Sequence, residues 1–425
     1  MRWLDLDGRK LLITRSLRTF GYGYLAVILA LYLQALGLDA FEIGVVLTAA
    51  IAGSAVMTVW WSLIADQYGR RKTVATMALL MVAGGVLVAF SRGLWPLLVA
   101  AASGTISATN SEVGVFLTVE QAVLPQTAPD ARRTWLYSIY DTLAAVAGAA
   151  GALFASTVGV WSRLGLAGAD AYRPLFVLYA LIGLANFVLF MSLSERVELA
   201  HLGGERRLLG VHRSAGTVLR LALLFGLDAF AGGFAVQSLV AYWFHLRFGF
   251  SPELLAVLFF WVNVFTAGSL LVAGWLAGRI GLLNTMVFTH LPSNVLLVLV
   301  PLMPSAPLAV LVYLARSSLS QMDVPTRKSY TMAVVDPDER TAAAGLTNVA
   351  RSAAGAISPL LTGVAFSLAA LGVPFFLSGG LKIAYDLLMY RTFRHIRPPE
   401  EAAALSTTLA DPARAGPRTP APGSG

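Results

Sequence analysis

Long apolar stretches that are almost free of charge constrain this chain more than any other feature of its sequence. A helix of about twenty apolar residues crosses a hydrocarbon core about 30 Å thick. Only 13% of the residues are Asp, Glu, Lys or Arg, about half the usual share and too few to cover a soluble surface. The sequence therefore predicts an all-α polytopic membrane protein with twelve transmembrane helices. They are expected at roughly 14–36, 42–65, 73–91, 95–119, 136–160, 173–193, 216–246, 252–277, 285–302, 307–332, 343–370 and 374–391.

Residues that carry enzyme chemistry are scarce. The chain has no cysteine, which excludes disulfides, thiolate metal sites and a thiol nucleophile. Its five histidines lie far apart and lack the spacing of metal ligands. The GxSxG and GxxxxGK[ST] patterns of hydrolases and phosphate-binding loops are absent. We therefore expect no catalytic residue, cofactor or metal, and the chain is not predicted to be an enzyme.

The basic residues indicate how the chain is oriented. If both termini are cytoplasmic, the outer loops hold only Arg92, Arg163, Arg173 and Arg247 of the 31 Lys and Arg residues. Most of the others then follow the positive-inside rule, and they face anionic lipid, not nucleic acid. Three more, Arg316, Arg351 and Lys382, fall inside apolar segments. Abundant Ala and Gly, with Arg far exceeding Lys, are typical of a GC-rich bacterial genome. The predicted location is therefore a bacterial inner membrane.

Short motifs recur at an offset of about 210 residues. The run from Ala65 to Arg71 resembles Ala277 to Gly281, and Pro129-Asp130-Ala131-Arg132 resembles Pro337-Asp338-Glu339-Arg340. Each pair follows the same helix of a six-helix set, which predicts two parallel repeats. The predicted parts are an N-terminal half at 1–193, a basic cytoplasmic linker at 194–215, a C-terminal half at 216–391 and a disordered tail at 392–425.

The loop after the second segment, from Ser62 to Lys72, carries a specific motif. It resembles the major facilitator superfamily pattern Gly-x-Leu-Ala-Asp-Arg-x-Gly-Arg-Lys/Arg-x at Asp66, Gly69, Arg70 and Arg71. Ser62 replaces the leading Gly and Gln67 replaces an Arg. This resemblance implies a monomeric secondary transporter whose two halves rock about a central site. It also implies that the first, fourth, seventh and tenth helices line the cavity.

The matching loop suggests a cytoplasmic gate. The resemblance implies that Asp66, with Gly69, Arg70 and Arg71, closes the cytoplasmic side by facing the positive end of a helix beginning near Ala343. The alternative is a positive-inside loop with one solvated carboxylate. Two further gate residues are Asp141 and Arg351, which either pair between helices or extend toward the interface.

Ionisable side chains at membrane depth are costly and usually face a cavity or a partner. Glu112 has no basic partner within one helical turn, so it is the first candidate for proton coupling, followed by Asp228 and Asp323. Arg316 lies seven residues before Asp323 and is predicted to share its helix face. The structural alternative is an Asp323–Arg327 pair, with Asp228 neutralising Arg316. We interpret Arg15 and Arg18 as interfacial anchors and His290 as a structural residue.

Aromatic and amide side chains complete a candidate substrate pocket. Such residues are also common at membrane interfaces and between packed helices. With Arg316, the candidates are Tyr22, Tyr24, Gln34, Asn110, Gln237, Trp261 and Asn263.

These features together favour a secondary active transporter. Its predicted activity is proton-coupled efflux of a small organic or amphipathic molecule by alternating access. The predicted partners are this small molecule, protons and the lipid bilayer. One alternative is transport of an anion, such as an organic acid, a phosphorylated metabolite or an oxyanion, bound by Arg316. A second alternative is a non-transporting receptor or scaffold on the same fold.

Overall fold

The computed structural model of the protein describes residues 4–109, 114–129, 133–198, 213–336 and 339–395, and within them it is helical without strands. The first six segments are α1 (Leu6–Ala35), α2 (Ala40–Tyr68), α3 (Arg70–Phe90), α4 with α5 (Leu94–Ala102, Val115–Val123), α6 with α7 (Arg133–Phe154, Thr157–Arg163) and α8 (Arg173–Met191). The next six are α9 with α10 (Ala215–Gly233, Gln237–Phe248), α11 (Pro252–Ile280), α12 (Leu282–Leu299), α13 with α14 (Ala306–Ser317, Asp323–Val334), α15 (Arg340–Ser367) and α16 (Val373–Phe393).

These segments confirm the predicted helical membrane fold. Nine helical spans of the described chain are long and apolar enough to cross a bilayer. Two of the other three segments, α4 with α5 and α13 with α14, are interrupted near their middle. The last, α16, carries Lys382 and Asp386, which lower its mean hydropathy. The predicted linker and tail fall mostly on 199–212 and 396–425, outside the described residues.

The prediction drew each segment as one continuous helix, but the fourth, seventh and tenth are interrupted near their middle and the fifth near its end. The three central breaks fall after Ala102, after Gly233 and after Ser317, and the fifth segment is interrupted between Phe154 and Thr157. At the first break Gly104 has φ of 71°, a left-handed conformation that glycine adopts without strain. Non-helical backbone is tolerated at membrane depth only where protein or a water-filled cavity surrounds it. The breaks therefore indicate the interior of the bundle.

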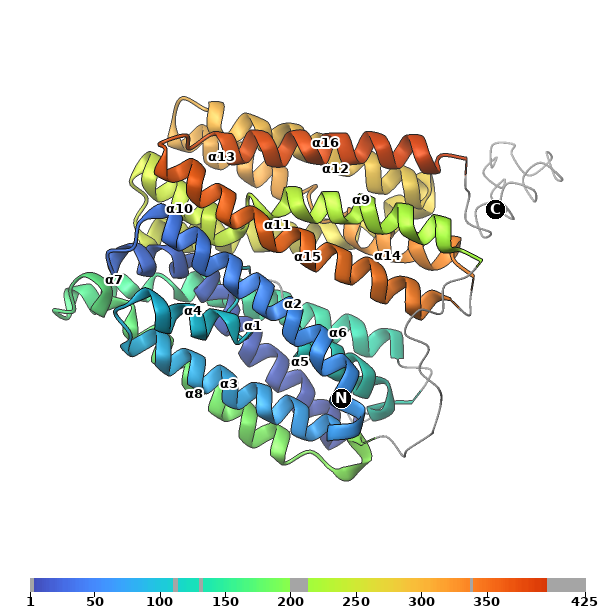
Figure 1. The fold of residues 1–425 in the computed structure, drawn as a ribbon, viewed down its shortest axis with the longest axis horizontal. Helices are drawn as coiled ribbons and strands as arrows, with labels where there is room; N and C mark the ends of the chain where they lie inside the picture. The colour runs from blue at the N-terminus through green and yellow to red at the C-terminus, as the bar shows by residue number, and fades with distance from the viewer. Residues whose placement is uncertain (1–3, 110–113, 130–132, 199–212, 337–338, 396–425) are drawn as a thin grey trace, which may run out of the picture.

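The helices form two halves, α1 to α8 and α9 to α16, which come together at one end of the molecule and diverge toward the other (Figure 1). We call the diverging end the terminal face, because α1 and α9 begin there and α16 ends there. At the opposite, far face one apolar cluster joins the halves and includes Leu29 of α1, Val240 of α10 and Phe259 of α11. At the terminal face the buried apolar residues form separate clusters within each half.

Contact between the halves runs mainly along α2 with α15 and α6 with α11. The α2–α15 crossing is tight, since a Cβ on Gly44 would lie 2.8 Å from the Pro359 carbonyl oxygen and 2.9 Å from the Gly363 Cα. Small residues of this kind let membrane helices approach closely. The halves are thus held together near the far face and separated near the terminal face.

Candidate functional site

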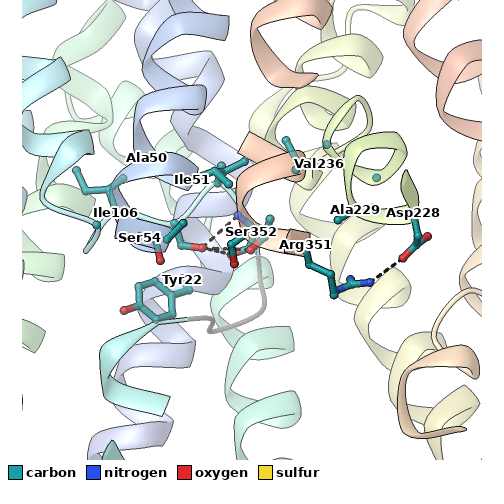
Figure 2. A pocket seen from close by; sticks show the side chains of 18 of the residues that line it. Tyr22, Ala50, Ile51, Ser54, Ile106, Asp228, Ala229, Val236, Arg351 and Ser352 are labelled. Carbon is teal, nitrogen blue, oxygen red and sulfur yellow. Dashed lines mark hydrogen bonds and ion pairs between the residues drawn. The ribbon is translucent and has the colours of Figure 1, made fainter. Parts of the chain in front are cut away.

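A cavity of about 310 Å³ lies between the halves. Figure 2 shows side chains of both halves around it, with Tyr22 and Ser54 on one side and Asp228 and Arg351 on the other. The far-face apolar cluster begins at the level of Tyr22, so the cavity is closed in that direction. Its lining residues are Tyr22, Ala50, Ile51, Ser54, Ala55, Gly104, Thr105, Ile106, Ser107, Ala108, Thr109, Asp228, Ala229, Gly232, Gly233, Val236, Arg351, Ser352, Gly355 and Lys382.

Charge on the cavity wall comes from the C-terminal half. Asp228 of α9 is 3% exposed, and two basic side chains that also line the cavity hold its carboxylate. Lys382 Nζ of α16 lies 2.6 Å from Asp228 Oδ1, and Arg351 Nη1 of α15 lies 3.0 Å from Asp228 Oδ2. Two cations and one carboxylate therefore face the cavity and leave an excess of one positive charge.

Behind this wall the same carboxylate continues into a larger network. Arg327 Nη1 of α14 lies 3.2 Å from Asp228 Oδ2 and 2.7 Å from Asp323 Oδ2. His290 Nε2 of α12 is 4.0 Å from Asp228 Oδ1, and its Nδ1 is 2.8 Å from Asp386 Oδ1. These residues form the C-half cluster: Asp228, His290, Asp323, Arg327, Arg351, Lys382 and Asp386.

The cavity wall of the N-terminal half is uncharged and mixes apolar with hydroxyl side chains. It also presents the open backbone of the α4–α5 break. Ser107 Oγ donates to the Thr109 carbonyl oxygen, and Ser103 and Thr105 share a hydrogen bond of 2.8 Å. Ser238 Oγ of α10 contacts the carbonyl oxygens of Ala108 and Ala26 at 3.0 Å each. These contacts connect the α4–α5 break and α1 of the N-terminal half to α10 of the C-terminal half.

A second buried ion pair lies inside the N-terminal half. Arg18 Nη2 of α1 contacts Glu120 Oε2 of α5 at 2.7 Å, and both side chains are 0% exposed. Thr14 Oγ1 and Tyr140 OH donate to the Glu120 oxygens at 3.0 and 2.7 Å, while Arg18 Nη1 donates to Asn186 Oδ1 at 3.2 Å. We call Thr14, Arg18, Glu120, Tyr140 and Asn186 the N-half cluster. None of the five lines the cavity.

The expected gate loop has a clear backbone structure. Gly69 ends α2 and begins α3 with φ of 103°. The first amides of α3, at Arg70 and Arg71, donate to the Glu198 carboxylate at 2.7 and 3.1 Å. The Asp66 side chain lies outside the described residues, so its role as a latch stays a prediction. Asp141 is exposed on α6, whereas Arg351 binds Asp228.

The structure brings only some of the predicted site residues together. Tyr22, Asp228 and Arg351 line the cavity, and Asp323 forms the expected pair with Arg327. Glu112 and Asn110 lie outside the described residues. The other cavity candidates do not line the cavity, since they pack in the core, lie near the far end or face outward: Tyr24, Gln34, Gln237, Trp261, Asn263 and Arg316.

Arg316 illustrates why a spacing rule failed. A seven-residue spacing places two side chains on one face only if the helix is continuous. The chain leaves the helix between Ser317 and Asp323, so the spacing rule does not apply. Arg316 packs over the Tyr313 ring at 5.6 Å and interacts with Asp323 only through longer-range electrostatics.

One further interpretation changes and two side chains gain partners that the sequence did not predict. Arg18 is not an interfacial anchor, because it is buried in an ion pair. His290, interpreted as a structural residue, is buried and contacts Asp386 within the C-half cluster. Lys382 was not proposed as a site residue, although a lysine inside an apolar segment with an aspartate one turn later was a usable signal.

Two six-helix halves around a central polar cavity define a secondary transporter, not an enzyme. A sequence profile of the Major Facilitator Superfamily matches residues 11–359. The chain belongs to this superfamily.

Similar proteins of known structure support the fold. The nucleoside transporter NupG (D323A mutant) superposes with a TM-score of 0.74 at 11% identity, over 91% of this chain and 100% of its own. A bacterial homolog of the human lysosomal transporter Spinster, in an inward-facing, occupied state, has a TM-score of 0.72 at 16% identity, over 92% of this chain and 97% of its own. A D-xylose–proton symporter has a TM-score of 0.70 at 15% identity, over 90% of this chain and 97% of its own.

A curated relative is similar in sequence over nearly the whole chain. It is the uncharacterized membrane protein YJR124C of Saccharomyces cerevisiae, 25% identical over 406 residues, which cover 88% of this chain and 91% of that protein. The chain is a multi-pass membrane protein. A yeast relative is neutral toward the predicted bacterial inner membrane, which stays a prediction.

Proposed function

We propose that the protein carries a small organic anion across the membrane together with a proton. The observation that supports this most is the cavity wall on which Asp228 is shared between Arg351 and Lys382. Both basic side chains line the cavity and are within reach of a bound molecule. The anion-binding alternative drawn from the sequence is kept, but Arg351 and Lys382 take the place of Arg316.

An anion matches this wall because its oxygens resemble the carboxylate that is already bound there. The guanidinium of Arg351 offers paired donors that suit a carboxylate or a phosphate, and Lys382 adds a compact charge. A substrate anion would compete with Asp228 for both. The hydroxyls of Ser54, Thr105 and Ser107 on the opposite wall suit a substrate that also carries hydroxyl groups.

An amphipathic efflux substrate, which the sequence favours, has less support from this cavity. Pockets for small molecules occupy about 300–1,000 Å³ and are mostly apolar and aromatic. This cavity is at the lower end of that range at about 310 Å³, and Tyr22 is the only aromatic side chain among its lining residues in the described chain. The relatives named as carriers of nucleosides and D-xylose have hydroxylated substrates, which match the Ser and Thr hydroxyls among the lining residues.

Proton coupling follows from what the anion displaces. An Asp228 carboxylate that loses Lys382 and Arg351 is left partly buried with a second negative charge nearby, which is unfavourable. Uptake of one proton by the cluster restores the balance of charge, so the proton and the anion move in the same direction. The similar D-xylose–proton symporter is named for this kind of coupling.

The separated clusters at the terminal face support a state open on that side. If both termini are cytoplasmic, as the basic loops predict, this state is open to the cytoplasm. Rocking of the halves about the α2–α15 contact then exposes the cavity to the far face.

The function can be tested in proteoliposomes with an imposed pH gradient. We expect acid outside to drive accumulation of a small anion. Gluconate and lactate are the probes for a hydroxylated carboxylate, and inorganic phosphate is the probe for a phosphate group. Xylose, uridine and ethidium represent neutral and amphipathic substrates. Protein-free liposomes and the Lys382→Met variant are the controls. The proposal would be contradicted if the protein transported ethidium or uridine but none of the three anions.

A further inference from the structure

His290 lies between two carboxylates that no other described side chain links in this way. Its Nδ1 is 2.8 Å from Asp386 Oδ1, and its Nε2 is 4.0 Å from Asp228 Oδ1. The ring is buried, with 4% of the side chain exposed. One nitrogen therefore faces the carboxylate at the cavity wall and the other faces a carboxylate with no cavity contact.

Asp386 is built to hold the imidazole in this orientation. Asn294, one turn after His290 on α12, donates from Nδ2 to Asp386 Oδ2 at 2.9 Å. His290 Nδ1 lies 2.8 Å from Asp386 Oδ1 and 3.1 Å from the same Asn294 Nδ2. The shorter contact is with an acceptor, which favours a proton on Nδ1. The Tyr385 ring meets the imidazole edge to face at 6.0 Å. A carboxylate on Nδ1 fixes the tautomer with its proton there and stabilises an imidazolium if one forms.

Charged side chains of four helices belong to the cluster around the imidazole. The three carboxylates and the three permanent cations balance if the imidazole is neutral. They are Asp228 on α9, Asp323 and Arg327 on α14, Arg351 on α15, and Lys382 and Asp386 on α16. This balance holds only while Arg351 and Lys382 are paired with Asp228.

We propose that His290 takes up the proton that accompanies the transported anion. This inference rests on the proposed function. A bound anion takes Arg351 and Lys382, and the cluster and the anion together then have an excess of one negative charge. A proton from cavity water passes by way of Asp228, which lines the cavity, to His290 Nε2. The Nε2–H of the imidazolium then faces Asp228, while its Nδ1–H stays hydrogen-bonded to Asp386. Release of the anion returns the cations to Asp228 and the proton to water.

His290 is better placed for this proton than Asp228 itself. Arg327 lies 3.2 Å from Asp228 and does not line the cavity, so an anion in the cavity does not compete for it, and this contact favours the charged carboxylate. Imidazole, by contrast, changes charge near neutral pH with small changes in its surroundings. The anion therefore controls the charge of His290 through the partners that Asp228 gains and loses.

A titration without substrate tests the link directly. Arg351→Gln removes one cation from Asp228, as the anion does, and keeps His290. We expect the imidazole titration of His290, followed by ¹⁵N NMR in detergent micelles, to move to higher pH by about one unit. Asp228→Asn should move it to lower pH. His290→Gln assigns the signal, and His245, whose Nδ1 contacts the Phe250 carbonyl oxygen, is the internal control. An unchanged His290 titration in Arg351→Gln would overturn the inference.

Transport measurements then test the proton itself. We expect His290→Gln to exchange gluconate across the proteoliposome membrane without a gradient. Its pH-driven accumulation of gluconate should be at least tenfold lower than that of the wild type. His245→Gln should behave as the wild type. Full pH-driven accumulation by His290→Gln would assign the proton to another group and overturn the inference. Failure of wild-type protein to move any of the anion probes would instead contradict the proposed function, a result that the titration without substrate distinguishes.

Discussion

The two halves place buried charge on equivalent segments and use it differently. In the N-terminal half, Arg18 of the first segment pairs with Glu120 of the fourth. In the C-terminal half, Asp228 of the seventh segment pairs with Arg327 of the tenth. The positions correspond in the six-helix repeat, but the signs are exchanged.

The N-half cluster is complete by itself. One cation meets one anion, and neutral donors or acceptors from Thr14, Tyr140 and Asn186 take further bonds. Burial of an ion pair is tolerated when hydrogen bonds satisfy it in this way. With both charged side chains 0% exposed, the N-half cluster has no group left for a substrate.

The C-half cluster is shared instead of closed. Asp228 is within 4.0 Å of basic nitrogens on α12, α14, α15 and α16, and two of these side chains line the cavity. Exchange of one anionic partner for another then requires no exposure of an unpaired charge. If the proposed function is correct, the same helix positions supply rigidity in one half and binding in the other.

The largest expected effect is in the N-half cluster. Glu120→Ala leaves Arg18 buried without a counter-charge, which should lower the free energy of unfolding by about 3–5 kcal/mol. Thermal unfolding in detergent micelles, followed by tryptophan fluorescence, measures this loss. The double variant Arg18→Met/Glu120→Leu should regain most of the stability and still transport. A stable Glu120→Ala protein that has lost only transport would show that both clusters are functional.

Lys382 tests the other side of the comparison. A hydrogen bond to a charged group contributes about 1.5–3 kcal/mol, so Lys382→Met should weaken gluconate binding about 10–100-fold. Asp228 keeps Arg351 and Arg327, so the unfolding temperature should fall less than in Glu120→Ala. Equilibrium binding to the purified protein measures the affinity. The control is Lys328→Met on exposed α14 surface, and an equal loss there would refute the specific role of Lys382.

Access from water should differ between the clusters as well. The chain has no cysteine, so a single one can be introduced beside each cluster. Ser352→Cys, on the cavity wall, should react with an anionic thiol reagent at least about tenfold faster than Thr14→Cys, which is 0% exposed. Mass spectrometry of timed samples gives both rates. Equal rates would mean that the N-half cluster opens to water.

The number and order of helices followed from the sequence because hydrocarbon thickness fixes the length of an apolar run. The breaks did not, since the chain around Phe234 is as apolar as the helices on either side. Apolarity reports burial in lipid or protein and carries no information on whether the backbone stays helical there. Two of the three central breaks lie beside the cavity lining, so the feature missed is one that shapes the site.

Prediction of the site was limited by helix rotation. Charge in an apolar segment identified Asp228 as a candidate, because such residues need a partner. Its partners come from four other helices, and their meeting depends on how each helix is turned. Trp261 shows the same limit, since α11 turns this predicted pocket residue outward with 47% exposed. Arg351 was assigned to a gate for the same reason.

The smallest expected effect concerns Arg316. If an anion were held by Arg316, replacement by Lys would remove the planar fork and weaken binding markedly. The structure places Arg316 away from the cavity lining, over the Tyr313 ring, on the other side of the α13–α14 break from Asp323.

Arg316→Lys keeps the charge and should change gluconate affinity less than about threefold, since only a packing contact worth about 0.5–1 kcal/mol is altered. Arg351→Lys is the matched comparison, because the same substitution at a side chain that lines the cavity should weaken binding at least tenfold. Reversed effects of the two substitutions would move the anion site from the α9–α15–α16 wall to the tenth segment, and the contrast between a shared and a closed cluster would no longer explain where the substrate binds.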